Sequence, residues 1–272
     1  MPDAHRRGAV SRIVDTHLHV WDTGLRDHPW LATAELPAVT GLPDEADRSY
    51  VLVEADAADA WDEAQWLDRV AADPRVHGIV ASLDLDGART DTELRRLRGL
   101  ASLVGVRLLL QDSGRFDDPD LLLGLRVVAD HGLPFDACVR AGELSQLRAL
   151  LAQVPELTVV LDHLGKPPLG DPTGLERWRA DLGALAELPQ VHCKLSGLPA
   201  EAADEDQLRR MRGPVVAHAL AMFGAGRCLI GSDRPVSRTA EDWCAWALSQ
   251  VDAEDRPRVG EQNAMTIYRR AA

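Results

Sequence analysis

Short apolar runs of strand length alternate along the chain with stretches in which apolar residues recur at helical spacing. The apolar runs are nearly continuous, which is typical of strands that a sheet buries on both faces. The helical spacing is clearest in Trp61, Ala64, Leu67 and Val70, and Asp73-Pro74 ends that stretch. The pattern predicts an opening strand that leads into His17 and His19, and further strands at residues 50–54, 77–85, 104–111, 134–139, 157–161, 191–195 and 228–231.

The stretches between these strands predict helices, and three details can be checked individually. We expect Asp91 to be the N-cap of the second helix, Pro214 to interrupt the long helix near its middle, and residues 22–49 to form a loop. The helices are predicted at residues 59–72, 92–102, 120–131, 145–153, 175–188, 206–223, 241–251 and 256–270.

Eight strand predictions that alternate with helices indicate a parallel sheet that is buried on both faces. Eight such units within 272 residues predict a (β/α)₈ TIM-type barrel. We find no composition shift, repeat or low-complexity segment, so residues 1–272 are expected to form one domain. An open, doubly wound sheet is the alternative, but no GxGxxG motif follows the first strand.

Composition and charge narrow the class of protein further. The net charge of −13 disfavours nucleic acid and anionic membranes as partners. No apolar run approaches the roughly 18 residues of a membrane-spanning helix, and residues 1–12 lack the apolar core of a signal peptide. We therefore expect a cytoplasmic protein, a monomer or small homo-oligomer, that acts on a small molecule. The four cysteines show no metal-binding spacing and are expected to be buried structural residues.

Polar side chains follow the predicted strands at the ends that face the active side of a barrel. His17 and His19 are spaced i, i+2, so they leave the first strand on the same side. Lys166 and Lys194 are the only lysines among thirty basic residues, and we expect each to mark a position that needs a compact ammonium. The ring of strand-end residues comprises His17, His19, Glu54, Asp84, Gln111, Arg140, His163, Lys194, Ser196 and Asp233.

Several of these stretches resemble motifs of one known family. Val14-Asp15-Thr16-His17-Leu18-His19 resembles the first-strand signature of the amidohydrolase superfamily. Further stretches, in family order over nearly the full chain, resemble its amidohydrolase-2 branch of sugar-lactone hydrolases, the fuconolactonase- and rhamnonolactonase-like proteins. They are Gly105-Val106-Arg107, Leu161-Asp162-His163-Leu164-Gly165-Lys166-Pro167, Lys194-Leu195-Ser196-Gly197, Gly231-Ser232-Asp233 and Asn263-Ala264.

The resemblance implies that water attacks the carbonyl of a small lactone, with a sugar aldonolactone as the expected substrate. Asp233 would be the general base, because an ionised carboxylate can accept the proton of water. His17, His19 and His163 would polarise the carbonyl directly or through a metal. The residues expected to bind substrate are Arg107, Arg140, Lys194, Glu54 and Arg234; for Lys166, substrate binding and loop anchoring are equally good interpretations.

The metal content is left open by the resemblance. Two-metal members carry a bridging lysine or glutamate on the fourth strand and a histidine on the fifth, where this chain offers Gln111 and Arg140 or Cys138. A two-metal site is therefore not expected. The alternatives are one divalent ion, with zinc favoured, or none. The expected ligands are His17, His19 and Asp233, with Glu54 or His163 as further candidates.

Two departures from the family pattern bear on substrate and activity. Arg234 stands where the family usually has Trp after the base; an arginine there could hold Asp233 ionised and attract an anionic substrate. The segment between the first two strands is also short for the family. Two alternative functions follow: a metal-dependent nonoxidative decarboxylase, disfavoured by the missing fifth-strand histidine, and a non-catalytic barrel that binds sugar acids.

Overall fold

Eight parallel strands form the centre of the molecule. The computed structural model describes residues 12–45 and 47–270. Neighbouring strands of the sheet follow one another in chain order, and every pair is parallel. The strands are β1 (Ile13–Leu18), β4 (Arg48–Val53), β5 (Val76–Ser82), β6 (Leu103–Leu109), β7 (Phe135–Cys138), β8 (Val159–Leu161), β9 (Val191–Leu195) and β10 (Cys228–Ile230).

The first and last strands of this sheet meet, which nearly closes it into a barrel. The backbone N–H of Asp233 donates to the carbonyl of His17 at 2.7 Å, and the N–H of His19 donates to the carbonyl of Arg234 at 2.9 Å. Gly231 permits this approach, because a Cβ there would lie 2.8 Å from the Cβ of His17. The predicted (β/α)₈ barrel is confirmed, and the open doubly wound sheet is wrong.

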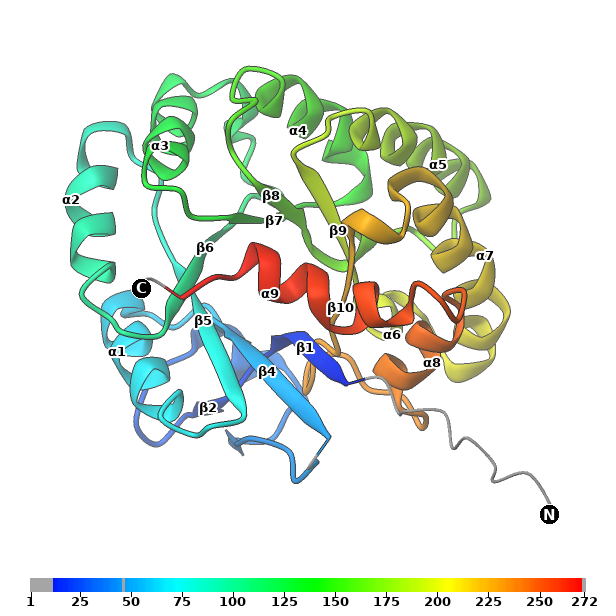
Figure 1. The fold of residues 1–272 in the computed structure, drawn as a ribbon, viewed down its shortest axis with the longest axis horizontal. Coiled ribbons are helices and arrows are strands. Elements are labelled where there is room, and N and C mark those ends of the chain that lie inside the picture. Colours follow the sequence, from blue (N-terminus) through cyan, green and yellow to red (C-terminus); the bar gives the residue numbers. More distant parts are fainter. Residues whose placement is uncertain (1–11, 46, 271–272) are drawn as a thin grey trace, which may run out of the picture.

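Helices surround the barrel between successive strands (Figure 1). Aspartates at residues 59, 118, 204 and 242 cap four of them by accepting backbone N–H groups. The helices are α1 (Ala60–Val70), α2 (Gly87–Leu97), α3 (Pro119–Asp130), α4 (Leu144–Leu151), α5 (Pro172–Ala186), α6 (Leu198–Glu201), α7 (Glu205–Phe223), α8 (Trp243–Ser249) and α9 (Asn263–Ile267).

The start of α2 differs most from its prediction. This helix begins five residues early, so Asp91 lies inside it and pairs with Arg95 at 2.8 Å instead of capping it. Its buried face starts with Gly87 and Thr90 and continues through Leu94. Glycine and threonine add little to an apolar pattern, so the first turn was missed.

Three other segments also depart from expectation. Helix α7 runs without interruption through Pro214. The predicted last helix is a π-helical turn, Arg258–Gln262, followed by the shorter α9. The expected loop at residues 22–49 contains a 3-10 turn (Pro29–Thr33) and two antiparallel two-residue strands, β2 (Trp21–Asp22) and β3 (Val39–Thr40). Strands of two residues are too short to produce a recognisable period.

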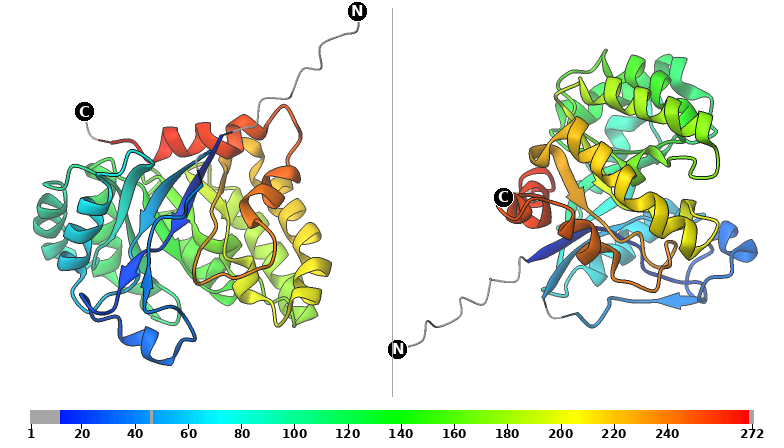
Figure 2. Two further views of the ribbon diagram at one scale, coloured as in Figure 1. Left: turned by 90° about the horizontal axis from the view of Figure 1, so that it is seen from below. Right: turned by 90° about the vertical axis from the view of Figure 1, so that its right-hand side faces the viewer.

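The apolar core has two parts. A large layer lies between the strands and the surrounding helices, and a smaller cluster fills the inside of the barrel. Tyr268 and Ala264, at the C-terminal end of the chain, belong to the inner cluster. Helix α9 therefore covers one end of the barrel, and the segment after β1 lies at the other end (Figures 1 and 2). Among the described residues, no helix has the length and apolar character needed to cross a membrane.

Candidate active site

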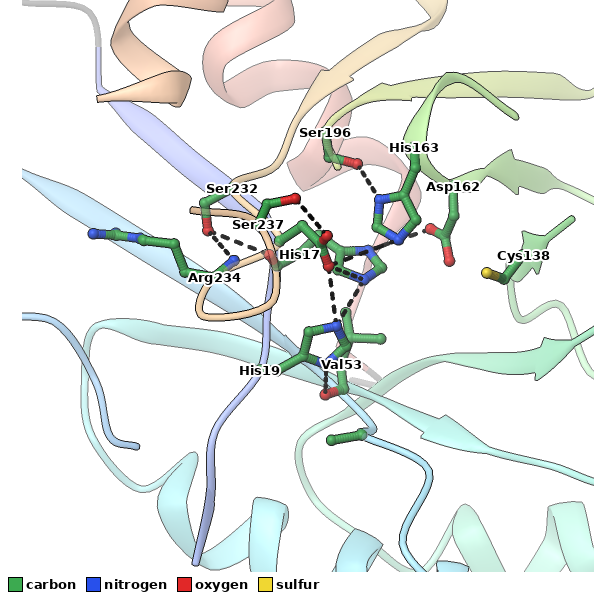
Figure 3. Close-up of polar contacts among 12 residues, drawn as sticks. His17, His19, Val53, Cys138, Asp162, His163, Ser196, Ser232, Arg234 and Ser237 are labelled. Carbon is green, nitrogen blue, oxygen red and sulfur yellow. Dashed lines mark hydrogen bonds and ion pairs between the residues drawn. The ribbon is translucent and has the colours of Figure 1, made fainter. Parts of the chain in front are cut away.

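Three histidines converge at the C-terminal ends of the strands (Figure 3), and the carboxylate of Asp233 lies among them. His17 and His19 come from the end of β1, His163 follows β8, and Asp233 follows β10. The Oδ1 atom of Asp233 lies 3.7 Å from Nε2 of His17, 3.3 Å from Nε2 of His19 and 3.7 Å from Nε2 of His163. The two Nε2 atoms of the β1 histidines are 3.2 Å apart. These four residues are the ones that the sequence predicted to be catalytic, and the structure brings them together.

Unusual backbone conformations place two of these side chains. Asp233 and His163 have φ values of 59° and 53°, a region that non-glycine residues rarely occupy. Gly197 lies against the ring of His163, because a Cβ at this glycine would come within 2.4 Å of the ring. The Lys194-Leu195-Ser196-Gly197 motif thus makes room for the histidine of the preceding strand.

A second contact orients each histidine ring. Nδ1 of His19 is 3.1 Å from the carbonyl of Val53; since a carbonyl only accepts, this nitrogen carries the proton and Nε2 is a free lone pair. Nδ1 of His163 is 3.0 Å from the Ser196 hydroxyl. Nδ1 of His17 is 3.3 Å from Oδ1 of Asp162. All three Nε2 atoms consequently face the carboxylate of Asp233.

Burial and mutual contacts set the charges of these groups. Burial lowers the pKa of His163 to about 4 and the pKa of His17 well below its usual range, so both imidazoles are neutral at pH 7. Burial alone would raise the pKa of Asp233, but the nearby histidines, His163 foremost, hold it well below its usual value. Asp233 is therefore an ionised carboxylate at neutral pH.

Lys194 lies beneath this centre and is fully buried. Its Nζ contacts Asp136, lies 3.1 Å from Oδ1 of Asp162 and lies 3.1 Å from Nδ1 of His17. The hydroxyl of Tyr268 donates to Asp136 at 2.8 Å. Lys194 does not line the cavity above the histidines, so it supports the site from inside the barrel, whereas we expected it to contact substrate.

Arg107 and Glu54 form a buried ion pair at the wall of the site. Nη1 of Arg107 is 2.6 Å from Oε1 of Glu54, and its Nε is 2.9 Å from Oδ2 of Asp162. Arg107 lines the cavity, as a substrate-binding residue would. Glu54 does not line it; its carboxylate accepts the N–H of Asp56 and holds the arginine.

A cavity of about 320 Å³ opens above the histidines. Trp30 forms part of one wall, with its Nε1–H donated to the carbonyl of Ala55 at 2.7 Å. Lys166 and Glu201 belong to the lining as well. The full lining comprises His19, Trp30, Ala55, Asp56, Arg107, Leu109, Gln111, Cys138, His163, Lys166, Gly197, Ala200, Glu201, Asp233 and Val236.

Two predicted substrate-binding residues lie away from this cavity. Arg140 is exposed, and its Nε is 2.6 Å from Oδ2 of Asp112. Arg234 points away from the histidines (Figure 3) and bonds both carboxylate oxygens of Glu45, at 2.9 and 3.0 Å. The structure therefore gives Arg234 a carboxylate partner other than Asp233. Both arginines follow a strand in the chain, but their side chains turn outward, which a strand-end position alone does not reveal.

Two residues that the structure brings to the site were not among the predicted site residues, Asp162 and Glu201. Asp162 orients His17 and lies within a motif already quoted for the family resemblance, and Ser196, a member of the predicted ring, orients His163. Glu201 ends α6, a four-residue helix with no periodic signal. Asp84, from the predicted ring, is exposed and pairs with Arg115 at 3.3 Å.

The donor set at the centre fits one divalent metal ion. His17, His19 and Asp233 are buried and offer ligand atoms within 4.8 Å of one another. Ligand atoms around one tetrahedral zinc lie roughly 3.3 Å apart, since zinc–ligand bonds are about 2.0–2.2 Å long, and the distances here are 3.2, 3.3 and 3.7 Å. With its proton on Nδ1, facing Asp162, His17 would direct a lone pair at the ion.

A second possible set consists of His17, Asp162 and His163. Arg107 and Lys194 already contact the carboxylate of Asp162, and their positive charges disfavour a cation there. At the fourth-strand position, where two-metal members carry the bridging ligand, Gln111 lines the cavity. At the fifth-strand position, Cys138 lines the cavity and Arg140 does not. The geometry agrees with a single ion at most.

A comparison with known proteins matches this chain to one family over residues 14–270. That family is the amidohydrolases. The chain belongs to it. A Burkholderia ambifaria protein named L-fucono-1,5-lactonase is 32% identical, with 94% of this chain and 95% of that protein covered. A Burkholderia multivorans protein of the same name is also 32% identical over the same shares.

A solved amidohydrolase has the same fold. The crystal structure of an amidohydrolase from Burkholderia multivorans with bound zinc superposes on this chain with a TM-score of 0.83. It is 30% identical, and the match covers 95% of this chain and 99% of that one. Membership of the amidohydrolase family and the barrel fold are thus confirmed, and a metal at the His/Asp centre is consistent with this relative.

Proposed function

We propose that this amidohydrolase is a lactone hydrolase that opens the ring of an aldonolactone, with a 1,5-lactone of a sugar acid as the substrate class. The observation that carries the proposal is the convergence of three imidazole Nε2 atoms on the carboxylate of Asp233 at the floor of a cavity. The two L-fucono-1,5-lactonases at 32% identity support the choice of lactone over amide or carboxylic acid substrates.

Asp233 acts as the general base in this mechanism. It is ionised at neutral pH and lies at the floor of the cavity, so it can accept a proton from a water molecule placed against the lactone carbonyl. The water oxygen forms a bond to the carbonyl carbon and gives a tetrahedral intermediate. When the ring C–O bond breaks, the ring oxygen leaves as a hydroxyl by taking the proton back from Asp233. The product is the open hydroxy acid.

His163 and Arg107 stabilise the negative charge that develops on the carbonyl oxygen. If the Ser196 hydroxyl donates to Nδ1 of His163, the proton of this neutral ring is on Nε2, which faces the cavity. Arg107 is held by two carboxylates and contributes a fixed positive charge at the wall. Donors that are already oriented before the reaction stabilise an oxyanion without reorganisation.

The β1 histidines flank the carboxylate of Asp233 and would be ligands for a metal ion. Asp162 orients the ring of His17 from below, and the carbonyl of Val53 orients that of His19. A divalent ion held by His17, His19 and Asp233 would supply Lewis-acid polarisation to the site. Asp233 would then be both a ligand and a proton acceptor, because a carboxylate has two oxygens with several lone pairs. The hydroxyl of Ser237 donates to Oδ2 of Asp233 at 2.8 Å and so helps to fix the orientation of the carboxylate.

The proposal is tested by acid release from L-fucono-1,5-lactone and related aldonolactones, with the uncatalysed hydrolysis subtracted. Asp233→Asn should lower kcat by about 10²–10⁴-fold, the usual contribution of a positioned base. Ser113→Ala, a substitution in the loop after β6, is the matched control and should keep full activity. Full activity in Asp233→Asn would exclude this residue as the base, and lactone binding without turnover by the wild type would favour the non-catalytic barrel.

Metal content is measured on the same preparations. Activity with and without a chelator, together with elemental analysis, separates the one-metal and metal-free forms of the mechanism. In the one-metal form, His19→Ala loses both bound metal and activity. In the metal-free form, the chelator leaves the rate unchanged.

A further inference from the structure

A second hollow adjoins the candidate active site. It has a volume of about 470 Å³ and lies between the segment after β7, the segment after β8 and helices α5 and α6. It shares two lining residues, Lys166 and Glu201, with the cavity above the histidines. These two side chains therefore form the boundary between the two spaces.

Lys166 is held at this boundary by its backbone. Its φ is 51°, in the left-handed region, and its N–H donates to the carbonyl of His163 at 2.8 Å. Its Nζ donates to Oε1 of Gln111, and no carboxylate of a described residue lies within 4.0 Å of it. Because an ammonium has three N–H donors, Lys166 keeps hydrogen-bonding capacity for a ligand.

Glu201 supplies the complementary acceptor. It is half-buried at the end of α6, and within residues 12–45 and 47–270 no hydrogen bond or ion pair engages its carboxylate. Burial raises the pKa of this carboxyl. A donor with remaining capacity, Lys166, and an acceptor, Glu201, at the same boundary are suited to hydroxyl groups, which donate and accept together.

The charges around the second hollow decide what else could enter it. Three cationic and three acidic side chains line it, so the hollow has no net preference for an anion such as a phosphate or a carboxylate. Its only aromatic lining residue, Trp178, is buried and offers no stacking face. The charged residues are Arg140, Lys166, Arg177, Asp171, Asp181 and Glu201. A neutral group rich in hydroxyls matches this lining best.

We propose that the second hollow is a subsite for a neutral polyhydroxylated substituent of the lactone, such as a glycosyl group, with Lys166 and Glu201 binding hydroxyls where the substituent leaves the ring. The substrates would then include lactones of disaccharide acids as well as those of single sugars. The catalytic part of this inference rests on the proposed lactone hydrolysis, whereas the binding part does not.

Gly142 allows a selective test of the second hollow. It lines the hollow and not the cavity above the histidines, and a Cβ at this position would meet no atom within 4 Å. Gly142→Phe therefore adds an aromatic side chain to the lining at a position where the new Cβ meets no atom. Gly226→Phe is the matched control, because that glycine is exposed, has the same free surroundings and lies just before β10, at the opposite ends of the strands.

The experiment compares kcat/KM for D-glucono-1,5-lactone with that for maltobiono- and melibiono-1,5-lactone, which carry a second sugar at different positions. We expect wild type and Gly226→Phe to accept at least one disaccharide lactone as well as the short one. In Gly142→Phe the ratio of the disaccharide to the short lactone should fall about tenfold, equivalent to the loss of one or two hydrogen bonds. An unchanged ratio, or rejection of both disaccharide lactones by the wild type, would overturn the subsite.

A binding measurement separates failure of this inference from failure of the proposed function. Calorimetry with maltobionic, melibionic and gluconic acids, the open acids of the same lactones, needs no turnover. Tighter binding of a disaccharide acid by the wild type, lost in Gly142→Phe, would support the subsite even if no lactone is hydrolysed. Equal affinities for all three acids in both proteins would exclude it.

Discussion

Removing the positive charge of Lys194 should destabilise the protein far more than removing the positive charge of Lys166, the only other lysine. Lys194 is fully buried and lies between the carboxylates of Asp136 and Asp162. Lys194→Met keeps the length of the side chain but leaves both carboxylates without their shared cation. Burial raises the pKa of Asp136 to about 6 even with the lysine beside it, so the ionised form of this carboxylate depends on the neighbouring cation.

The magnitude follows from two limits. Breaking a buried ion pair by removing one partner costs about 3–5 kcal/mol. The carboxylate left behind can instead take up a proton, which at pH 7 costs an aspartate of ordinary pKa about 4 kcal/mol, since each pH unit above about 3.9 costs 1.36 kcal/mol. The expected loss is therefore about 3–4 kcal/mol. For 272 residues, at roughly 2.1 cal/mol/K each, this lowers Tm by about 5–7 °C.

The loss should depend on pH in a definite direction. A carboxyl whose folded pKa lies above its unfolded value destabilises the protein increasingly as the pH rises above the unfolded value. At pH 5 the cost of protonating one aspartate falls to about 1.5 kcal/mol, because only about one pH unit separates the solution from the unfolded pKa. The difference in Tm between Lys194→Met and wild type should consequently shrink on acidification.

Thermal unfolding at pH 5 and pH 7 checks both statements. Lys166→Met is the matched control, because Lys166 has no carboxylate partner within 4.0 Å among the described residues and should shift Tm by about 1 °C or less. Adding Asp136→Asn to Lys194→Met removes the second buried charge and should recover part of the lost stability. Equal losses in both lysine variants, or a further loss in the double variant, would refute this account of the buried cluster.

Two further predictions test the neighbourhood of the site. Gly197→Ala should lower the free energy of unfolding by about 1–3 kcal/mol in urea and should reduce lactone turnover. The reason is that alanine would have to adopt a φ of 69° and its Cβ would lie 2.4 Å from the ring of His163. Wild-type turnover in a folded variant would contradict this role of Gly197. The carboxylate of Glu63, 3.4 Å from Nε2 of His28, raises the pKa of His28, so the stabilising effect of this ion pair is complete below about pH 6.5 and is lost as the pH rises through the folded pKa. His28→Gln should therefore lose more stability at pH 6 than at pH 8.5 in urea unfolding, and an equal loss at both would argue against the ion pair.

Much of the fold could be predicted from the chain because a parallel barrel has a strong one-dimensional signal. The continuous apolar runs that became β4 to β10 must be buried on both faces, and no other common architecture repeats such runs eight times with helices between them. The errors lie where that signal is weak. Gly87 and Thr90 begin α2 without an apolar pattern, and the two-residue strands β2 and β3 show no period.

The reactive centre was equally accessible from the sequence. His17 and His19 lie at the end of β1, His163 and Asp233 come shortly after β8 and β10, and strand ends of a barrel meet at one face. Their meeting therefore follows from chain order alone once the barrel is assumed. The structure added that all three imidazoles direct Nε2 at the same carboxylate oxygen.

Tertiary structure alone decided which charged residues face the cavity. Lys194, Arg140 and Arg234 also sit at strand ends, but the first is buried among carboxylates and the other two turn outward to Asp112 and Glu45. The direction of a long side chain depends on which partner neutralises its charge, and those partners lie far away in the sequence. Strand order thus determined where the chemistry is located, and long-range charge pairing determined which cations remain free to meet a substrate.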